Sequence, residues 1–173
     1  MQKVVVIGPE STGKSTLSEQ LATHYQAAWV PEFAREYLLS HGTDYQFEDL
    51  LTIAKGQLDL QRKAEEVNQH HLLILDTDMY VMKVWCEFVF NRCHNFILDR
   101  IAEQSDNIYL LCNPDLPWVA DELREYPDPA SRIVLYHMYK DILVNQHLPW
   151  IEIRGGYSER LSLAIQGIDK YAS

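Results

Sequence analysis

The segment Gly8-Pro9-Glu10-Ser11-Thr12-Gly13-Lys14-Ser15 constrains this chain more than any other, because it has the phosphate-binding spacing G-x-x-x-x-G-K-[ST]. The four residues before it, 4–7, are β-branched and apolar, as is typical of a buried parallel strand. Leu17, Leu21 and Tyr25 follow at helical spacing. The motif therefore lies between a strand and a helix, where free backbone amides can face an anion.

This phosphate-binding loop (P-loop) supplies most of the nucleotide contacts that the sequence predicts. Its glycines allow the backbone to wrap around a phosphate, and Lys14 is expected to reach the β- and γ-phosphates. The Ser15 hydroxyl is expected to ligate Mg²⁺. The alternative is a chance match in a glycine-containing loop, which the flanking strand and helix disfavour. The predicted nucleotide-binding residues are Gly8, Glu10, Ser11, Thr12, Gly13, Lys14, Ser15 and Thr16.

Length and composition narrow the class of protein. A chain of 173 residues is expected to form a single domain over 1–173. The net charge of −10 argues against a nucleic-acid partner, although a P-loop still binds phosphate locally. The three cysteines form no C-x-x-C pattern, which favours reduced, mostly buried thiols in a cytoplasmic protein. No apolar run approaches the roughly 18 residues that are needed to span a membrane, so no membrane-spanning helix is expected. Because the first residues already have the pattern of a strand, no signal peptide is expected either.

Short apolar strands alternate with amphipathic helices along the chain. This alternation predicts an α/β fold with a five-stranded parallel sheet and helices on both faces. Strands are expected at 4–7, 27–30, 70–75, 108–112 and 150–153, and helices at 15–25, 32–39, 47–68, 81–89, 96–102, 133–146 and 159–171. The proline-rich segment 113–130 is a candidate lid.

Each predicted strand is followed by residues that suggest a binding site. The P-loop follows the first strand, Glu32 the second, Asp76 and Asp78 the third, the candidate lid the fourth, and Gly155-Gly156 the fifth. Ligands of parallel α/β sheets bind at the carboxyl ends of the strands. We therefore expect these residues to converge on one crevice.

Two aspartates after the third strand are assigned different tasks. Asp76 ends the apolar run 72–75 and is expected to hold Mg²⁺, directly or through water. Asp78 either binds a substrate hydroxyl or caps the next helix. The pair His70-His71 lacks an H-E-x-x-H pattern or a second ligand cluster, so no metal site is expected there.

The segment after the second strand contains a candidate general base. Glu32 is placed to accept the proton of an acceptor hydroxyl during phosphoryl transfer. The alternative is an acidic residue that only stabilises the positive end of a helix dipole. Arg35 follows one turn later and either contacts substrate or forms an ion pair with Glu32 or Glu36.

The candidate lid carries charged and aromatic residues. Arg124, and Arg132 shortly after it, are candidate catalytic groups that close over the transferring phosphoryl group and neutralise its charge. Trp118 and Asp121 are candidate substrate-binding residues. The alternative is a solvated turn held by local salt bridges.

Four of these segments occur in the order found in NadR-type ribosylnicotinamide kinases, which the chain resembles over nearly its whole length. They are residues 8–16, 32–37, 76–78 and 117–124. The first is generic, whereas Pro-Trp-Val-Ala-Asp-x-Leu-Arg is specific to that family. The resemblance implies an adenylate-kinase-like P-loop fold, ATP and Mg²⁺ as cofactors, and phosphorylation of the ribose 5′-hydroxyl of nicotinamide riboside.

The chain departs from that family in two respects. Family members often place a tryptophan directly before the glutamate that corresponds to Glu32, whereas this chain has Pro31 there and Trp29 two residues earlier. The H-x-G-H signature of the adenylyltransferase domain that is often fused to the kinase is also missing. Two alternative functions stay open. One is a kinase for another nucleoside or nucleotide, and the other is a regulatory ATP-binding switch. The expected partner is a small nucleoside, with no nucleic acid and no membrane.

Overall fold

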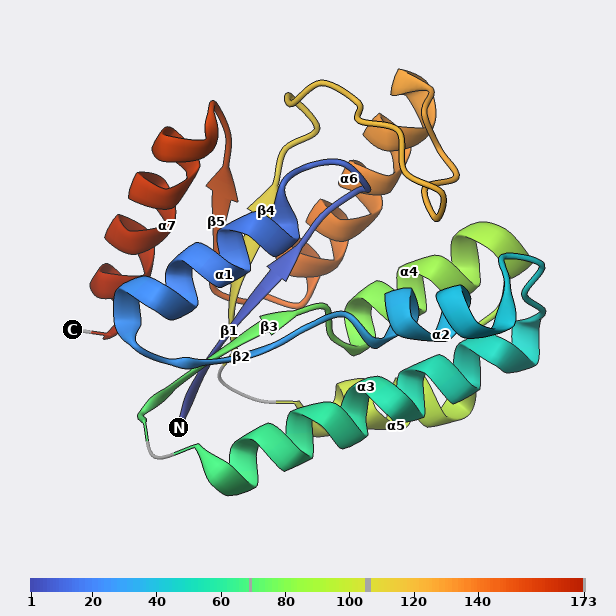
Figure 1. The fold of residues 1–173 in the computed structure, drawn as a ribbon, viewed down its shortest axis with the longest axis horizontal. Coiled ribbons are helices and arrows are strands. Elements are labelled where there is room, and N and C mark those ends of the chain that lie inside the picture. Colours follow the sequence, from blue (N-terminus) through green and yellow to red (C-terminus); the bar gives the residue numbers. More distant parts are fainter. Residues whose placement is uncertain (69, 105–106, 173) are drawn as a thin grey trace.

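A twisted parallel sheet forms the centre of the computed structural model, which describes residues 1–68, 70–104 and 107–172 (Figure 1). Within these residues the strands are β1 (Gln2–Ile7), β2 (Ala28–Val30), β3 (Leu72–Asp76), β4 (Asn107–Cys112) and β5 (Trp150–Ile153). They are ordered β2-β3-β1-β4-β5, and all four pairings are parallel. The predicted α/β fold with a five-stranded parallel sheet is confirmed.

Helices connect these strands. They are α1 (Lys14–Tyr25), α2 (Phe33–His41), α3 (Phe47–Val67), α4 (Met79–Phe90), α5 (Asn95–Glu103), α6 (Pro129–Asn145) and α7 (Tyr157–Ala172). The predicted third strand is shifted, since β3 begins at Leu72 and includes Asp76. None of these helices, in the part of the chain described, combines the length and apolarity that a bilayer crossing requires.

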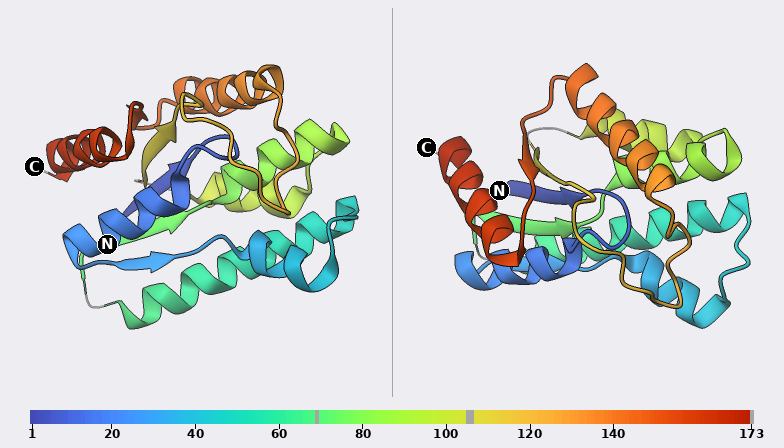
Figure 2. Two further views of the ribbon diagram at one scale, coloured as in Figure 1. Left: turned by 45° about the horizontal axis from the view of Figure 1, so that its top comes forward. Right: turned by 90° about the horizontal axis from the view of Figure 1, so that it is seen from above.

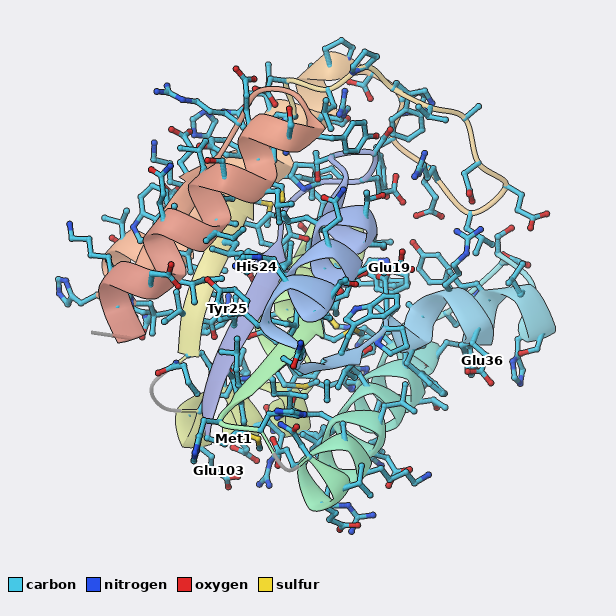
Figure 3. All side chains as sticks on the ribbon, turned by 60° about the vertical axis from the view of Figure 1, so that its left-hand side comes forward. Met1, Glu19, His24, Tyr25, Glu36 and Glu103 are labelled. Carbon is cyan, nitrogen blue, oxygen red and sulfur yellow. The ribbon has the colours of Figure 1, made fainter. Side chains whose placement is uncertain are left out.

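Alternate residues of the central strand face two different helical layers, which is the pattern of a strand buried on both sides. Val4 and Val6 of β1 belong to a core cluster with residues of α1 and α7. Val5 and Ile7 belong to another cluster with residues of α4 and α6. Helices α1 and α7 also contact each other, and the Tyr25 hydroxyl of α1 donates to Asp169 of α7 at 2.8 Å (Figure 3).

A third apolar cluster lies beyond the sheet and holds α2, α3, α4 and α5 together (Figure 1). Its fully buried members include Leu50 and Ile53 of α3 and Met82 and Cys86 of α4. This packing fixes the start of α2 near the carboxyl end of β2. The residue that connects the two elements, Glu32, is thereby held at the same edge of the sheet as the P-loop.

The segment between β4 and α6 runs past the P-loop and reaches α2 (Figure 2). It is shorter than the predicted lid, because α6 begins at Pro129, four residues before the predicted helix. The Asp128 side chain accepts the Ser131 amide at 2.8 Å as the N-cap, and Pro129 occupies the first helical position, where its missing N–H costs nothing. The lid segment is therefore residues 113–128.

Candidate active site

One cavity of about 620 Å³ opens at the carboxyl edge of the sheet. The end of β2, the start of α2, Asp76, the lid segment and the inner faces of α4 and α6 line it. All eight predicted nucleotide-binding residues of the P-loop line it too: Gly8, Glu10, Ser11, Thr12, Gly13, Lys14, Ser15 and Thr16. The predicted convergence is present for four of the five strand ends, at the P-loop, Glu32, Asp76 and the segment after β4. Gly155 and Gly156, which follow the fifth strand, do not line the cavity, although the next residue, Tyr157, does.

The P-loop backbone takes conformations that glycine permits. Gly8 has φ of 145°, and a Cβ atom there would lie 2.7 Å from the Cys112 carbonyl oxygen. Gly13, with φ of 76°, precedes the first residue of α1, Lys14. The Lys14 ammonium donates to the Pro9 carbonyl at 2.9 Å, across the mouth of the loop. The loop thus combines a helix N-terminus with one mobile positive charge, which is what phosphate binding needs.

Arg160 of α7 anchors the P-loop from behind and was not predicted. Its side chain is 1 % exposed, and its guanidinium donates to the carbonyls of Thr12 at 3.0 Å, Asn113 at 2.9 Å and Gly155 at 2.7 Å, and to the Asp115 carboxylate. These contacts join the loop to the ends of β4 and β5. No sequence pattern distinguishes this arginine from a surface arginine on an amphipathic helix.

Ser15 and Asp76, the two residues predicted to ligate Mg²⁺, are in direct contact. The Ser15 hydroxyl donates to Oδ2 of Asp76 at 2.6 Å. Oδ1 of Asp76 is buried and has no hydrogen-bond partner among the described residues. A buried carboxylate oxygen without a donor fits a cation ligand, and Mg²⁺ typically takes one or two protein oxygens and completes its shell with phosphate and water. Burial raises the pKa of Asp76, opposed by Lys14 and the Ser15 hydroxyl.

Glu32 lines the same cavity at the N-cap position of α2. Its side chain makes no capping hydrogen bond to the helix. Burial raises the pKa of Glu32 to about 7, and the negative charges of Asp76 and Glu10 add to this effect while Lys14 opposes it. A carboxylate that is half protonated near neutral pH is suited to exchange protons with a substrate.

Arg35 and Asp121 close the cavity from the outside. The Arg35 guanidinium donates to both carboxylate oxygens of Asp121, at 3.2 and 3.1 Å, and so joins α2 to the lid segment. Neither Glu32 nor Glu36, the partners considered from the sequence, forms a salt bridge with Arg35 among the described residues. Glu36 is exposed on the outer side of α2 (Figure 3). Both Arg35 and Asp121 line the cavity, as does Arg124.

Two P-loop side chains hold the lid segment. Oε2 of Glu10 accepts the amides of Glu125 and Tyr126, at 2.9 and 3.2 Å. The Ser11 hydroxyl accepts the Val119 amide at 2.9 Å and the Arg124 guanidinium at 3.4 Å. The loop that the sequence assigns to nucleotide binding therefore also fixes the lid over the cavity.

Two predicted site residues do not line the cavity. They are Arg132, a candidate catalytic group, and Trp118, a candidate substrate-binding residue. Arg132 is 6 % exposed and donates to the carbonyls of Ser11 and Leu116, at 3.1 and 3.2 Å. Its guanidinium carbon lies 5.8 Å from the centroid of the Trp118 ring. The reason for the difference is that α6 starts early and buries Arg132 beneath the lid, where it supports the backbone of both loops.

Asp78 also lies outside the cavity and takes the second of its two predicted roles. It is 1 % exposed and is the N-cap of α4, where Oδ1 accepts the amides of Tyr80 and Val81 at 2.9 and 3.4 Å. Oδ2 accepts the Tyr109 hydroxyl at 2.9 Å. The preceding residue, Thr77, has φ of 95°, an uncommon value for a β-branched residue, so the chain turns sharply between the two aspartates.

The Asp78→Asn variant is expected to be more stable than the wild type by about 1–2 kcal/mol at pH 8. Burial raises the pKa of Asp78 to about 6, so the charged form is disfavoured in the folded chain. Because this value exceeds the unfolded value of about 3.9, wild-type stability falls as the pH rises through about 6. Asparagine keeps the cap acceptor, and the loss of a helix-dipole contact worth about 0.3–1 kcal/mol only partly offsets the gain.

Urea unfolding of both chains between pH 4 and pH 8 measures this difference, which should shrink toward pH 4. Acceptor KM should stay within about two-fold of the wild type, because Asp78 is a cap and contacts no ligand cavity. A tenfold rise in acceptor KM would instead make Asp78 a substrate ligand.

A group of aromatic side chains that lines the cavity, called the aromatic chamber below, was not predicted as a site. Its walls are Trp85 and Phe88 of α4, Tyr126 of the lid segment and Tyr139 of α6. The indole Nε1 of Trp85 donates to the Tyr45 hydroxyl at 2.9 Å. The periodicity of residues 81–89 signals an apolar helix face, but it does not separate side chains that fill a core from those that line a cavity.

The comparisons with known proteins agree with this geometry. A family model described as an AAA domain matches residues 3–160. The chain belongs to this family. The trifunctional NAD biosynthesis/regulator protein NadR of Salmonella typhimurium is 27% identical over 158 residues, which cover 89% of this chain and 38% of that protein. The chain therefore spans well under half the length of this curated relative.

Solved structures resemble this AAA-domain chain over nearly its whole length. A crystal structure of NadR in complex with NR has a TM-score of 0.81 and 23% identity, covering 98% of this chain and 51% of that one. The deoxyadenosine kinase of M. mycoides with bound dATP has a TM-score of 0.63 and 12% identity, covering 98% of this chain and all of that one. At these identities the structural likeness establishes the P-loop kinase fold.

Proposed function

We propose that this chain is an ATP-dependent kinase that transfers the γ-phosphoryl group of ATP to the ribose 5′-hydroxyl of nicotinamide riboside, giving nicotinamide mononucleotide. The observation that carries the proposal is one cavity that holds three parts together. They are a P-loop, a metal-binding pair and a half-protonated carboxylate beside an aromatic chamber. Each part serves a separate need of phosphoryl transfer to an alcohol.

ATP binds at the P-loop in this proposal, and the NadR protein that was solved with NAD and AMP-PNP supports it. The backbone amides and Lys14 hold the triphosphate, and Arg124 stabilises its charge from the lid segment. Ser15 and Asp76 would hold Mg²⁺, which neutralises negative charge on the phosphates when bound. Cytoplasmic location is part of the same proposal, since all three cysteines are free thiols.

Glu32 accepts the proton of the 5′-hydroxyl. The oxygen of that hydroxyl forms a bond to the γ-phosphorus, the bond from this phosphorus to the bridging oxygen breaks, and ADP leaves. The pKa of about 7 keeps a substantial fraction of Glu32 ionised at neutral pH. Its basicity is also higher than that of an ordinary carboxylate, which strengthens a general base.

The acceptor lies in the aromatic chamber. Nicotinamide riboside carries a fixed positive charge on its ring, and a cation over an aromatic face gains roughly 0.5–2 kcal/mol. Trp85, Phe88 and Tyr139 offer such faces, and the carboxylates of Glu10 and Glu32 lie in the same cavity. A nucleoside monophosphate would need a cationic pocket, but Arg35 of α2, which with Arg124 is one of two arginines among the described residues that line the cavity, already pairs with Asp121.

A panel of acceptors tests the proposal with Mg·ATP and the purified chain. Turnover with nicotinamide riboside should exceed turnover with uridine, cytidine or adenosine by at least about tenfold, since the desolvated cation–π and Coulomb contacts are absent for neutral bases. Formation of ADP and of nicotinamide mononucleotide is measured by chromatography. The mononucleotide should accumulate, because the adenylyltransferase signature is missing from this chain.

Three outcomes would contradict the proposal. A preference for a nucleoside monophosphate would make the chain a nucleotide kinase, and equal turnover of neutral nucleosides would remove the cationic acceptor. ATP binding with no acceptor-dependent turnover would favour a regulatory ATP-binding module. Replacing Trp85 by leucine, with Phe96 of α5 replaced by leucine as a matched control away from the cavity, localises the effect to the chamber.

A further inference from the structure

Gln57 of α3 contacts the backbone on both sides of Glu32. Its side chain is 2 % exposed. Oε1 accepts the Phe33 amide at 2.7 Å, and Nε2 donates to the Pro31 carbonyl at 3.2 Å. One buried amide therefore satisfies a donor and an acceptor that flank the candidate base, although 24 and 26 residues separate it from them in sequence.

One of these contacts satisfies an amide at the start of α2 from outside the helix. Glu32 is the N-cap, with an extended backbone at φ −69° and ψ 115°, and it makes no capping bond with its side chain. The Phe33 amide belongs to the first turn, whose N–H groups have no acceptor within the helix. Gln57 supplies that acceptor for the Phe33 amide, and the Glu32 side chain, which makes no capping bond, lines the cavity.

The residue before Gln57 fixes the same segment in a second way. A Cβ atom on Gly56 would lie 2.2 Å from the Phe33 ring, so this ring rests directly on the backbone of α3. On the other side of Glu32, the ring of Pro31 restricts φ to about −65°. Backbone freedom around Glu32 is thus restricted by Gln57, by Gly56 and by Pro31.

We propose that Gln57 is a positioning residue for Glu32 in phosphoryl transfer. The proposal rests on the function proposed above, with Glu32 as the proton acceptor. A general base must lie within hydrogen-bond distance of the proton that it removes. A displacement of about 1 Å, caused by a change away from the chemistry, can cost about 10²-fold in rate. Gln57 does not line the cavity, and its side chain bonds to the backbone on either side of Glu32, so its effect should pass through Glu32.

The test compares Gln57→Met, which keeps side-chain length and removes both hydrogen bonds, with the wild type. We expect kcat to fall about 10- to 100-fold, with ATP KM within about three-fold of the wild-type value. In a Glu32→Gln background the same substitution should change kcat by less than about two-fold, because the group that it positions is already absent. Ile168→Ala, a buried change in α7 within an apolar cluster that includes neither Gln57 nor Glu32, should lower Tm and leave kcat unchanged.

The outcomes separate this proposal from the proposed function. If Gln57→Met lowers kcat equally in both backgrounds, or lowers Tm alone, Gln57 has only a structural role and the proposal is overturned. If Glu32→Gln itself keeps wild-type turnover, the base assignment fails, whatever Gln57 does. Should Gln57→Met not fold, Gln57→Asn carries the test, because it keeps a neutral amide at this position and shortens its reach to the Phe33 amide and the Pro31 carbonyl by one methylene. It should lower kcat in the wild-type background and leave kcat of Glu32→Gln unchanged.

Discussion

The Lys14→Ala variant is expected to turn over at least about 10²- to 10³-fold more slowly than the wild type at saturating ATP and acceptor. Phosphoryl transfer depends mainly on positioning and on neutralising charge, and Lys14 is the one lysine among the residues that line the cavity. Its ammonium lies 2.9 Å from the Pro9 carbonyl, at the mouth of the loop where the phosphates bind in our proposal. A coupled assay for ADP measures the loss.

The same substitution should leave the fold intact. It removes one hydrogen bond to a partly buried carbonyl, which is worth about 1 kcal/mol. Lys14→Met keeps the aliphatic stem and should lose as much activity, because the charge is the functional part. Lys83→Ala, which removes a lysine paired with Glu87 on α4, is the matched control and should keep wild-type turnover. Wild-type turnover of Lys14→Ala, with an unchanged circular dichroism spectrum, would contradict the P-loop assignment.

The sequence predicted the parts of the site that follow strands. The P-loop follows β1, Glu32 lies two residues after the end of β2, and Asp76 is the last residue of β3, so their meeting at one edge follows from a parallel sheet alone. The order of the strands, with β1 in the centre, did not need to be known for this inference. Local patterns were sufficient because the chemistry sits at positions that the topology brings together.

The sequence was less informative where a role depends on packing. Asp78 and Arg132 are charged residues beside the motif, but α4 and α6 begin where they do because of local caps, and this buries both side chains outside the cavity. Trp118 belongs to the lid segment, but its ring lies near Arg132 and does not line the cavity. Gln57 and Arg160 act on segments distant in sequence, through contacts that no local pattern encodes.

The substitution of Glu32 by glutamine should lower kcat by about 10²- to 10³-fold, the lower part of the range for loss of a general base. The low end is expected because the transition state of phosphoryl transfer is loose and needs little proton removal. Glutamine keeps the shape of the side chain, so ATP KM should change little. Glu36→Gln, an exposed neighbour on the outer side of α2, is the matched control and should keep wild-type kcat.

The pH dependence of kcat/KM in the Glu32→Gln and Glu36→Gln variants tests whether Glu32 is the base. Burial raises the pKa of Glu32 to about 7, so wild-type kcat/KM should rise with pH up to about 7 and then level off as the carboxylate becomes fully ionised. The acidic limb should be absent from Glu32→Gln and present in Glu36→Gln. Stability should change in the opposite sense. Because the folded pKa exceeds the unfolded value of about 4.3, the charged carboxylate destabilises the wild type increasingly as pH rises through about 7.

Glu32→Gln should therefore have a higher Tm than the wild type at pH 8, and the gap should narrow toward pH 5. An enzyme that loses activity while gaining stability has lost a functional group and not its fold, which is the pattern expected when a strained or desolvated site serves catalysis. Two results would contradict the role. Unchanged kcat would remove Glu32 from proton transfer. A rise in acceptor KM with kcat intact would make Glu32 a ligand of the ribose. The base would then have to come from Asp76 or Glu125, two other carboxylates of the cavity whose pKa is raised by burial.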